Sequence, residues 1–221
     1  MIWTPVLLSL GIAASATLIA GCVGIALAAW LARARFVGRE WVDVIVTAPM
    51  VLPPTVLGYY LLTALGRSSS IGRAYEAVTG DSIAFSRTGA VIAASIAALP
   101  FVLKSARVAF EEIDPRIIAA ARTLGARPVR VFFRVELPVA RAGIAAGLAL
   151  GFARSLGEFG ITLMLAGNLP GETQTGALAI YDAVQAGRDA DATHISLTLT
   201  TFAVLLLYIV NRLAARRHHA F

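Results

Sequence analysis

The chain has 221 residues, of which 58% are hydrophobic and 14% are charged, and its formal net charge is +6. Soluble domains are about 25% charged and need polar side chains on their surface, so this composition excludes an ordinary soluble fold. The basic residues lie between long apolar runs, which is typical of membrane topology and argues against nucleic-acid binding. The single cysteine, Cys22, excludes an intrachain disulfide framework and a cysteine-based zinc cluster, and we expect no metal site.

Five apolar runs are predicted to cross a membrane as helices, at about residues 6–32, 42–65, 88–107, 139–167 and 194–213. The second run contains Pro49, Pro53 and Pro54, which remove backbone donors, so we expect it to be kinked or broken. Pro100 is expected to kink the third run. The sequence therefore predicts an all-α integral membrane protein in which residues 1–221 form one domain.

Lysine and arginine residues are distributed unevenly between the two sides of these runs. The segments that follow runs one, three and five hold 14 of them, whereas the segments that follow runs two and four hold four. Arg154 is left inside run four. Because such residues collect on the cytoplasmic side of a membrane, the pattern predicts an external N-terminus, a cytoplasmic connector at residues 111–138 and a cytoplasmic C-terminus.

The connector at residues 111–138 is longer than a loop between two spans needs to be, and it contains signals for helices. Asp114, followed by a proline, is suited to cap a helix, and Gly125 is suited to end that helix in a left-handed conformation. Pro128 can start a second short helix over residues 129–135. Arginines alternate with apolar side chains here, so two interpretations stay open: a segment bound to lipid headgroups, or a docking element for a soluble partner.

Run four carries a row of small residues and two charges. The small residues recur every four positions, at Gly143, Gly147, Gly151 and Ser155. Such a row lets another helix approach closely, and three interpretations stay open: packing within one subunit, an interface between two copies, or a wall of a transport pathway. Arg154 and Glu158 lie four residues apart on one helix, so we expect an internal ion pair. Direct contact of Arg154 with an anion is the alternative.

Two stretches of the connector follow a spaced motif. They are Ala119, Ala120, Ala121, Arg122, Thr123, Leu124 and Gly125 and, after nine further residues, Val135, Glu136, Leu137 and Pro138. This pattern resembles the cytoplasmic signature of ABC importer permeases, which reads Glu-Ala-Ala, three residues, Gly, nine residues, Ile, any residue, Leu-Pro. The spacing agrees throughout, while Ala119 replaces the glutamate and Val135 the isoleucine. The resemblance favours a docking element over a lipid-bound segment.

This resemblance implies a type I ABC importer transmembrane domain (MetI-like), with about five transmembrane helices and a cytoplasmic coupling-helix pair. In such permeases the coupling helices sit in a cleft of a separate ATPase subunit, so Arg122, Thr123 and Leu124 would lie near the ATPase and Gly125 would form the turn. Two copies would form the channel, two ATPases would dock, and a periplasmic binding protein would deliver the substrate. The chain would then be no enzyme and hold no cofactor, because ATP and Mg would bind to the partner ATPase; its sequence lacks a Gly-x-x-x-x-Gly-Lys-Ser/Thr loop.

The second half of the chain narrows the resemblance. Residues 152–160 and 163–171 resemble the oxyanion branch of these permeases, which includes sulfate and molybdate importers. The Glu-Thr-Gln-Thr run at 172–175 and the Leu-Ala-Ile-Tyr run at 178–181 resemble molybdate permeases in particular. The resemblance thus implies a multi-pass molybdate permease of the bacterial inner membrane. The alternatives are a permease for sulfate or tungstate, and a non-transport membrane scaffold whose connector binds membrane lipid.

Overall fold

The structure, a computed structural model, describes residues 3–34 and 36–215, without the side chains of residues 206, 207, 209–211 and 213–215. Its elements are α1 (Trp3–Arg33), α2 (Arg39–Thr47), the 3-10 turn η1 (Ala48–Met50), α3 (Pro54–Leu65), α4 (Ser70–Thr79), α5 (Arg87–Glu111), α6 (Pro115–Thr123), α7 (Pro128–Val131), the π turn η2 (Phe132–Glu136), α8 (Leu137–Leu156), α9 (Gly160–Ala166), α10 (Gly176–Gln185) and α11 (Asp189–Ala215). Within these described residues there is no strand, and the predicted all-α class is confirmed. The arginines at positions 35, 216 and 217, which entered the charge count, lie outside the described residues.

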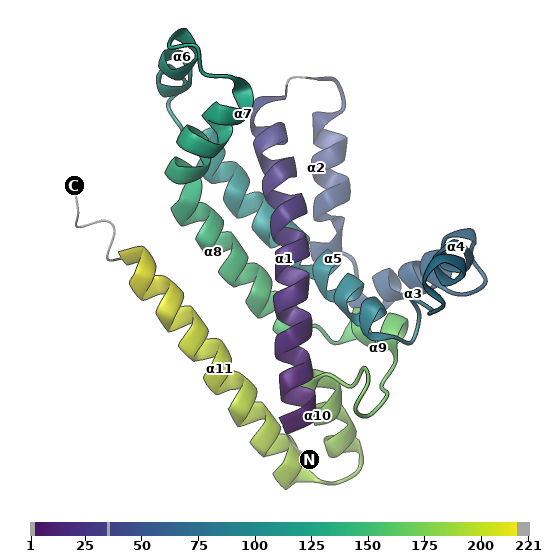
Figure 1. Cartoon of the computed structure of the whole chain (residues 1–221). Helices are drawn as coiled ribbons and strands as arrows, with labels where there is room; N and C mark the ends of the chain where they lie inside the picture. Colours follow the sequence, from purple (N-terminus) through teal and green to yellow (C-terminus); the bar gives the residue numbers. More distant parts are fainter. Residues whose placement is uncertain (1–2, 35, 216–221) are drawn as a thin grey trace.

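Three long helices, α1, α5 and α8, form the centre of the molecule (Figure 1). Small residues bring their backbones close together, as the packing of membrane helices requires. A Cβ atom added to Gly24 of α1 would lie 3.2 Å from the side chain of Val102 on α5. One apolar cluster joins all three helices to the connector, and its buried members are Ala28, Ala29, Leu31, Leu103, Ala106, Phe110, Ile113, Ala140 and Ile144.

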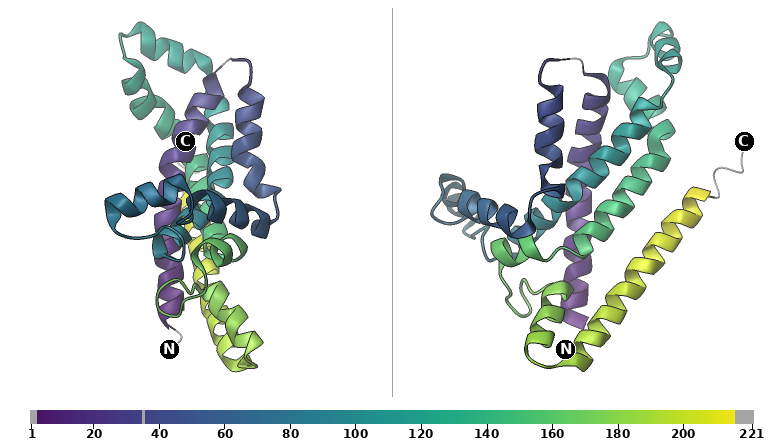
Figure 2. Two further views of the ribbon diagram at one scale, coloured as in Figure 1. Left: turned by 90° about the vertical axis from the view of Figure 1, so that its right-hand side faces the viewer. Right: turned by 180° about the vertical axis from the view of Figure 1, so that it is seen from behind.

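The elements divide between the two ends of this bundle. The loop between α1 and α2 lies with α6 and α7 at one end, which we call the connector end (Figures 1 and 2). The start of α1 lies with α10 and the start of α11 at the opposite end, and α3 and α4 extend to one side. The first loop and the connector therefore lie on the same side of the molecule, as the distribution of charges predicts.

Three helices of the described chain are long and apolar enough to cross a membrane: α1, α5 and a continuous helix over Pro128–Leu156. The second run forms two apolar helices, Arg39–Met50 and Pro54–Leu65, that are bent by 110° relative to each other, so its crossing of the membrane as one span stays a prediction. The prediction of a broken run is confirmed, and Pro53 shows the reason, because its extended ψ of 131° ends one helix just before Pro54 starts the next. The fifth run lies inside α11, and its crossing of a membrane stays a prediction.

The prediction that run four crosses the membrane as one helix over residues 139–167 is wrong. α8 ends at Leu156, and the short helix α9 begins only at Gly160. The side chain of Glu158 stabilises this break, because its Oε1 accepts the N–H of Ile161 at 2.7 Å and so satisfies a free donor at the start of α9. Run three is not broken in this way, because α5 continues through Pro100 as one helix of 25 residues.

The second short helix predicted in the connector, over residues 129–135, is also wrong as a separate element. It is the beginning of the 29-residue helix Pro128–Leu156, which continues through the π turn η2. In this turn the N–H of Leu137 donates to the carbonyl of Phe132, five residues earlier. One wider turn accommodates Pro138, which lacks an N–H and would crowd the preceding turn of a regular α-helix.

Candidate functional site

The first connector helix, α6, is built as the sequence predicts. The Asp114 carboxylate accepts the N–H of Arg116 at 2.8 Å and caps the helix. At the other end Gly125 has a φ of +79°, and the N–H of Ala126 donates to the carbonyl of Ala121 at 3.1 Å. This left-handed glycine turns the chain back toward Pro128, so the two helical segments form a compact projection at the connector end.

This projection exposes apolar side chains together with arginines. Leu124 is 88% exposed, Val129 68% and Phe133 60%, and α6 has no buried residue. Of the motif residues, those exposed are Ala119, Ala120, Arg122, Thr123, Leu124, Gly125 and Pro138, and those half-buried are Ala121, Val135 and Leu137. Exposed apolar groups beside arginines are typical of a surface that binds a partner. The roles predicted for these residues at an ATPase stay predictions.

The base of the projection contains a buried charge that the sequence analysis missed. Glu136 lies at the end of the π turn with only 1% of its side chain exposed, and it forms an ion pair with Arg33 at the end of α1. The family signature accepts any residue at this position, so the motif itself gives no reason to single it out. A buried carboxylate is costly unless it is paired, which makes Arg33 its stabilising partner.

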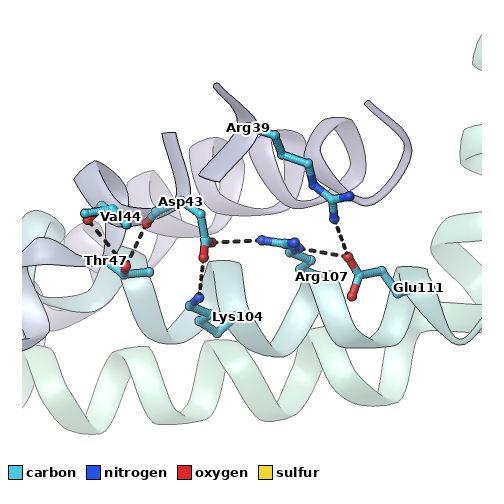
Figure 3. Close-up of polar contacts among 7 residues, drawn as sticks. All are labelled: Arg39, Asp43, Val44, Thr47, Lys104, Arg107 and Glu111. Carbon is cyan, nitrogen blue, oxygen red and sulfur yellow. Dashed lines mark hydrogen bonds and ion pairs between the residues drawn. The ribbon is translucent and has the colours of Figure 1, made fainter. Parts of the chain in front are cut away.

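A second charged cluster joins α2 to α5 (Figure 3). The Asp43 carboxylate contacts Lys104 and Arg107, each at 2.8 Å. Glu111 contacts Arg107 at 2.9 Å and Arg39 at 2.8 Å. No residue of α2 is fully buried, so these pairs add to the contact that the half-buried Val42 and Val46 make with the apolar cluster. In the sequence alone, the basic members of this cluster indicate only the topology of the chain.

The row of small residues on α8 packs against α5 of the same chain. Three of its members are glycines, which leave no room for a side chain. A Cβ atom added to Gly143 would lie 2.5 Å from Ala109. One added to Gly147 would lie 2.9 Å from Ser105, and one added to Gly151 would lie 2.9 Å from Val102. Ser155 continues the contact, since its hydroxyl donates to the Ala94 carbonyl at 3.2 Å. The row therefore packs within one subunit, while an interface between two copies and a wall of a transport pathway stay predictions.

The predicted pair of Arg154 and Glu158 is confirmed. The Arg154 Nη2 lies 2.6 Å from the Glu158 Oε2, and the glutamate side chain is only 1% exposed. The other oxygen of Glu158 caps α9, so one carboxylate ties the end of α8 to the start of α9. The pair fixes the break in run four and leaves no oxygen of Glu158 without a contact.

The run at residues 172–175, which suggested a molybdate permease, has a structural role. Thr173 is fully buried, and its hydroxyl accepts the N–H of Leu169 at 3.1 Å. Arg87 of α5 donates to the backbone carbonyls of Gly171 and Glu172. The run therefore fixes a loop at the opposite end of the bundle. In the part of the chain that the structure describes, no group of three or more His, Cys, Asp or Glu side chains could hold a metal ion.

The comparison with protein families gives this arrangement its identity. The model of the family described as "Binding-protein-dependent transport system inner membrane component" matches residues 22–219, which include the connector, both charged clusters and the glycine row. This chain belongs to that family. It is a multi-pass, inner-membrane component of a transport system.

Several relatives are similar over nearly their whole length. The molybdenum transport system permease protein ModB of Haemophilus influenzae is 43% identical over 202 residues, which cover 91% of this chain and 87% of that protein. The ModB of Escherichia coli K12 is 41% identical over 213 residues, covering 96% and 93%. The putative molybdenum transport system permease protein YvgM of Bacillus subtilis is 38% identical over 210 residues, covering 95% and 92%.

Two solved structures share the fold of this family member. A bacterial ABC transporter involved in the import of the acidic polysaccharide alginate matches with a TM-score of 0.77 at 18% identity, covering 96% of this chain and 78% of that one. The MetNI methionine ABC transporter in an inward-facing conformation matches with a TM-score of 0.71 at 17% identity, covering 97% and 93%. The predicted fold of an ABC importer membrane domain is confirmed.

Proposed function

We propose that this permease carries molybdate across the inner membrane as the membrane-spanning subunit of an ATP-driven importer. The observation that carries the proposal is the similarity along nearly the whole chain to proteins named as molybdenum transport permeases.

The proposal includes an orientation and a set of partners. The connector end faces the cytoplasm, and the N-terminus faces outward, in agreement with the excess of lysine and arginine in the segments on the connector side. Two copies of the chain enclose the pathway, two ATPase subunits that bind ATP and Mg dock on α6, and a periplasmic binding protein delivers molybdate. The exposed side chains of Leu124 and Val129 supply apolar anchors for such an ATPase.

The mechanism follows from how the connector is built into the bundle. It begins at the end of α5 and returns into the helix that becomes α8, and these two helices pack on each other through the glycine row. A displacement of α6 by a closing pair of ATPases is therefore passed directly to two spans that move together. Selectivity lies mainly in the binding protein, because Arg154 is already occupied by Glu158.

Replacing Gly125 with valine tests the docking role. Its φ of +79° is unfavourable for valine, which changes the turn, while open space surrounds the position. Gly80 is a matched control, because it ends the surface helix α4 with the same φ of +79° and equally open surroundings. With ATPase and binding protein reconstituted in vesicles, we expect ATP-driven molybdate uptake to be lost in Gly125→Val and kept in Gly80→Val.

The same vesicles separate the competing functions. Molybdate uptake that tungstate and sulfate suppress only weakly supports the proposal, whereas preferential uptake of sulfate or tungstate makes the chain a permease for that oxyanion. A chain that neither associates with the ATPase nor transports any of the three anions would be the non-transport scaffold. In that case Gly125→Val and Gly80→Val would differ only in their binding to lipid vesicles.

A further inference from the structure

We propose that the adjoining ends of α1 and α2, on either side of the short loop between them, are a second part of the coupling machinery, because their side chains hold both ends of the connector. The loop is flanked by Arg33 at the end of α1 and Arg39 at the start of α2. Arg33 pairs with Glu136, and Arg39 pairs with Glu111. The two carboxylates lie where the connector ends and where it begins. The proposal rests on the proposed function, since it assigns these residues a role in passing the movement of a docked ATPase to the spans.

The contact between Arg33 and Glu136 is the stronger of the two. Glu136 is almost completely buried, while the side chain of Arg33 is 35% exposed, so the arginine reaches inward from the surface to a charge that water does not reach. The carboxylate lies in the π turn, at the point where the connector becomes the long helix. A single wide turn inside a helix is a common feature of functional sites. The pair therefore fixes α1 to the joint about which the connector would move.

The contact between Arg39 and Glu111 is part of the cluster shown in Figure 3. Glu111 is the last residue of α5 and is shared by Arg39 and Arg107. Arg107 also contacts Asp43, so α2 is attached to α5 at two successive turns. The side chains here are 19% to 40% exposed, which makes each pair individually weaker than the buried one. As a network they hold α2 to the helix that leads into the connector.

An apolar base lies beneath both contacts. The cluster that includes Leu31 of α1, Phe110 of α5 and Ile144 of α8 also receives Val42 of α2 and Phe132 of the π turn. Phe110 and Phe132 pack as a tilted pair with their ring centroids 6.1 Å apart. The same elements are thus joined by charged contacts and by close apolar packing. If the connector moved relative to α1 and α2, either the ion pairs or this packing would break.

Charges that only set membrane topology would not need this arrangement. Topology depends on the number of lysines and arginines on each side, and acidic residues contribute little to it. The pairing of each flanking arginine with a carboxylate at one end of the connector is not required for that purpose. Arg33, Arg39, Glu111 and Glu136 are therefore positioning residues, which act on transport through the connector.

The decisive measurement is the number of molybdate ions taken up per ATP hydrolysed in vesicles that hold the chain, its ATPase and its binding protein. Glu136→Gln keeps the shape of the side chain and the count of basic residues. We expect it to retain ATPase binding and ATP hydrolysis while the uptake per ATP falls by about five- to tenfold, in the range typical of coupling between sites. Glu111→Gln is expected to lower the ratio by about twofold, because its contacts are more exposed. Exchanging the charges, with Arg33→Glu and Glu136→Arg together, is expected to restore part of the ratio.

Glu76→Gln is the matched control for Glu111→Gln. Glu76 lies on α4, away from the connector, and pairs with Arg67 at a distance of 3.3 Å. Its side chain is 37% exposed, against 40% for that of Glu111. We expect its uptake per ATP to equal that of the unaltered chain. A merely structural role for Glu136 and Glu111 would reduce the amount of assembled complex but leave the ratio unchanged, and that result overturns the proposal. If Glu136→Gln does not assemble, the ratio measured for Glu111→Gln decides. Failure of the unaltered chain to take up molybdate would instead overturn the proposed function, and this inference with it.

Discussion

Helix α5 contacts α8 on one side and α2 on another, and the two interfaces are built from opposite materials. Against α8, glycines remove side chains so that the backbones approach closely, as at Gly147 beside Ser105. Against α2, ion pairs such as the contact of Asp43 with Lys104 join the two helices, and the apolar contact is made by half-buried side chains such as Val42, since no residue of α2 is fully buried. Close packing resists any change of shape, whereas charged pairs near the surface can separate and re-form at small cost.

This difference shows which parts of the permease move together. Both ends of the connector belong to the tightly packed pair, because it leaves from α5 and returns into the helix of α8. The connector, α5 and α8 therefore form one rigid unit, against which α1 packs through small residues, whereas α2 is attached to it in part by charges. Three substitutions test this division.

The largest effect is expected at the α5–α8 interface. In Gly147→Leu the new side chain meets the Ser105 Cβ at 2.9 Å and the Val102 carbonyl oxygen at 3.2 Å, so backbone atoms must shift. We expect the free energy of unfolding in mixed micelles to fall by about 3 kcal/mol. Gly11→Leu on α1 is the control, because no atom lies within 4 Å of its added Cβ, and it should change stability by about 0.5 kcal/mol at most. Equal effects of the two variants would show that the interface is not closely packed.

An intermediate effect is expected where α8 ends. Glu158→Ala removes the cap of α9 and leaves Arg154 without its partner. Because the glutamate is buried and the arginine is 30% exposed, we expect a loss of about 2 kcal/mol, below the range for fully buried pairs. Glu76→Ala, which removes an exposed pair, should cost less than about 1 kcal/mol. The difference between the two losses in the free energy of unfolding reflects the burial of Glu158. Equal losses for Glu158→Ala and Glu76→Ala would contradict a buried ion pair at the end of α8.

The smallest effect is expected at the α2–α5 interface. Asp43→Asn weakens the contacts with Lys104 and Arg107, which should lower the free energy of unfolding by about 1 kcal/mol. The loss should shrink in about 1 M salt, where charges are screened beyond roughly 3 Å. The loss in Gly147→Leu should not depend on salt. Unfolding of both variants at low and high salt compares the two interfaces directly, and a salt-independent loss for Asp43→Asn would argue against an attachment made by charges.

Features set by neighbouring residues could be predicted from the sequence. The cap at Asp114, the left-handed Gly125 and the ion pair of Arg154 with Glu158 each depend on residues within one or two helical turns. The break at Pro53 is of the same kind, because proline restricts its own φ and the residue before it. Local chemistry decides these features wherever the segment lies in the fold.

Features that depend on distant residues were missed or mistaken. Arg33 and Glu136 meet only because α1 ends beside the π turn of a distant helix, and no spacing in the sequence indicates that. The break after Leu156 covers only Gly157, Glu158 and Phe159 between two apolar stretches, and the carboxylate that stabilises it was assigned to an ion pair alone and not to the start of a new helix. The same limit applied to the row that includes Gly143, which was recognised as a packing surface although its partner helix was not.

The π turn at Phe132–Glu136 also sets an angle. In a regular α-helix each residue advances by about 100° around the axis, so a turn that holds one extra residue rotates everything after it by about that amount. Upstream of the turn lies the exposed surface of Leu124 and Val129, and downstream of it lies the row that begins at Gly143. Removing one residue from this turn would keep the residues of both surfaces but rotate one surface relative to the other about the helix axis. The glycine row would then no longer face α5 while the connector faces its partner.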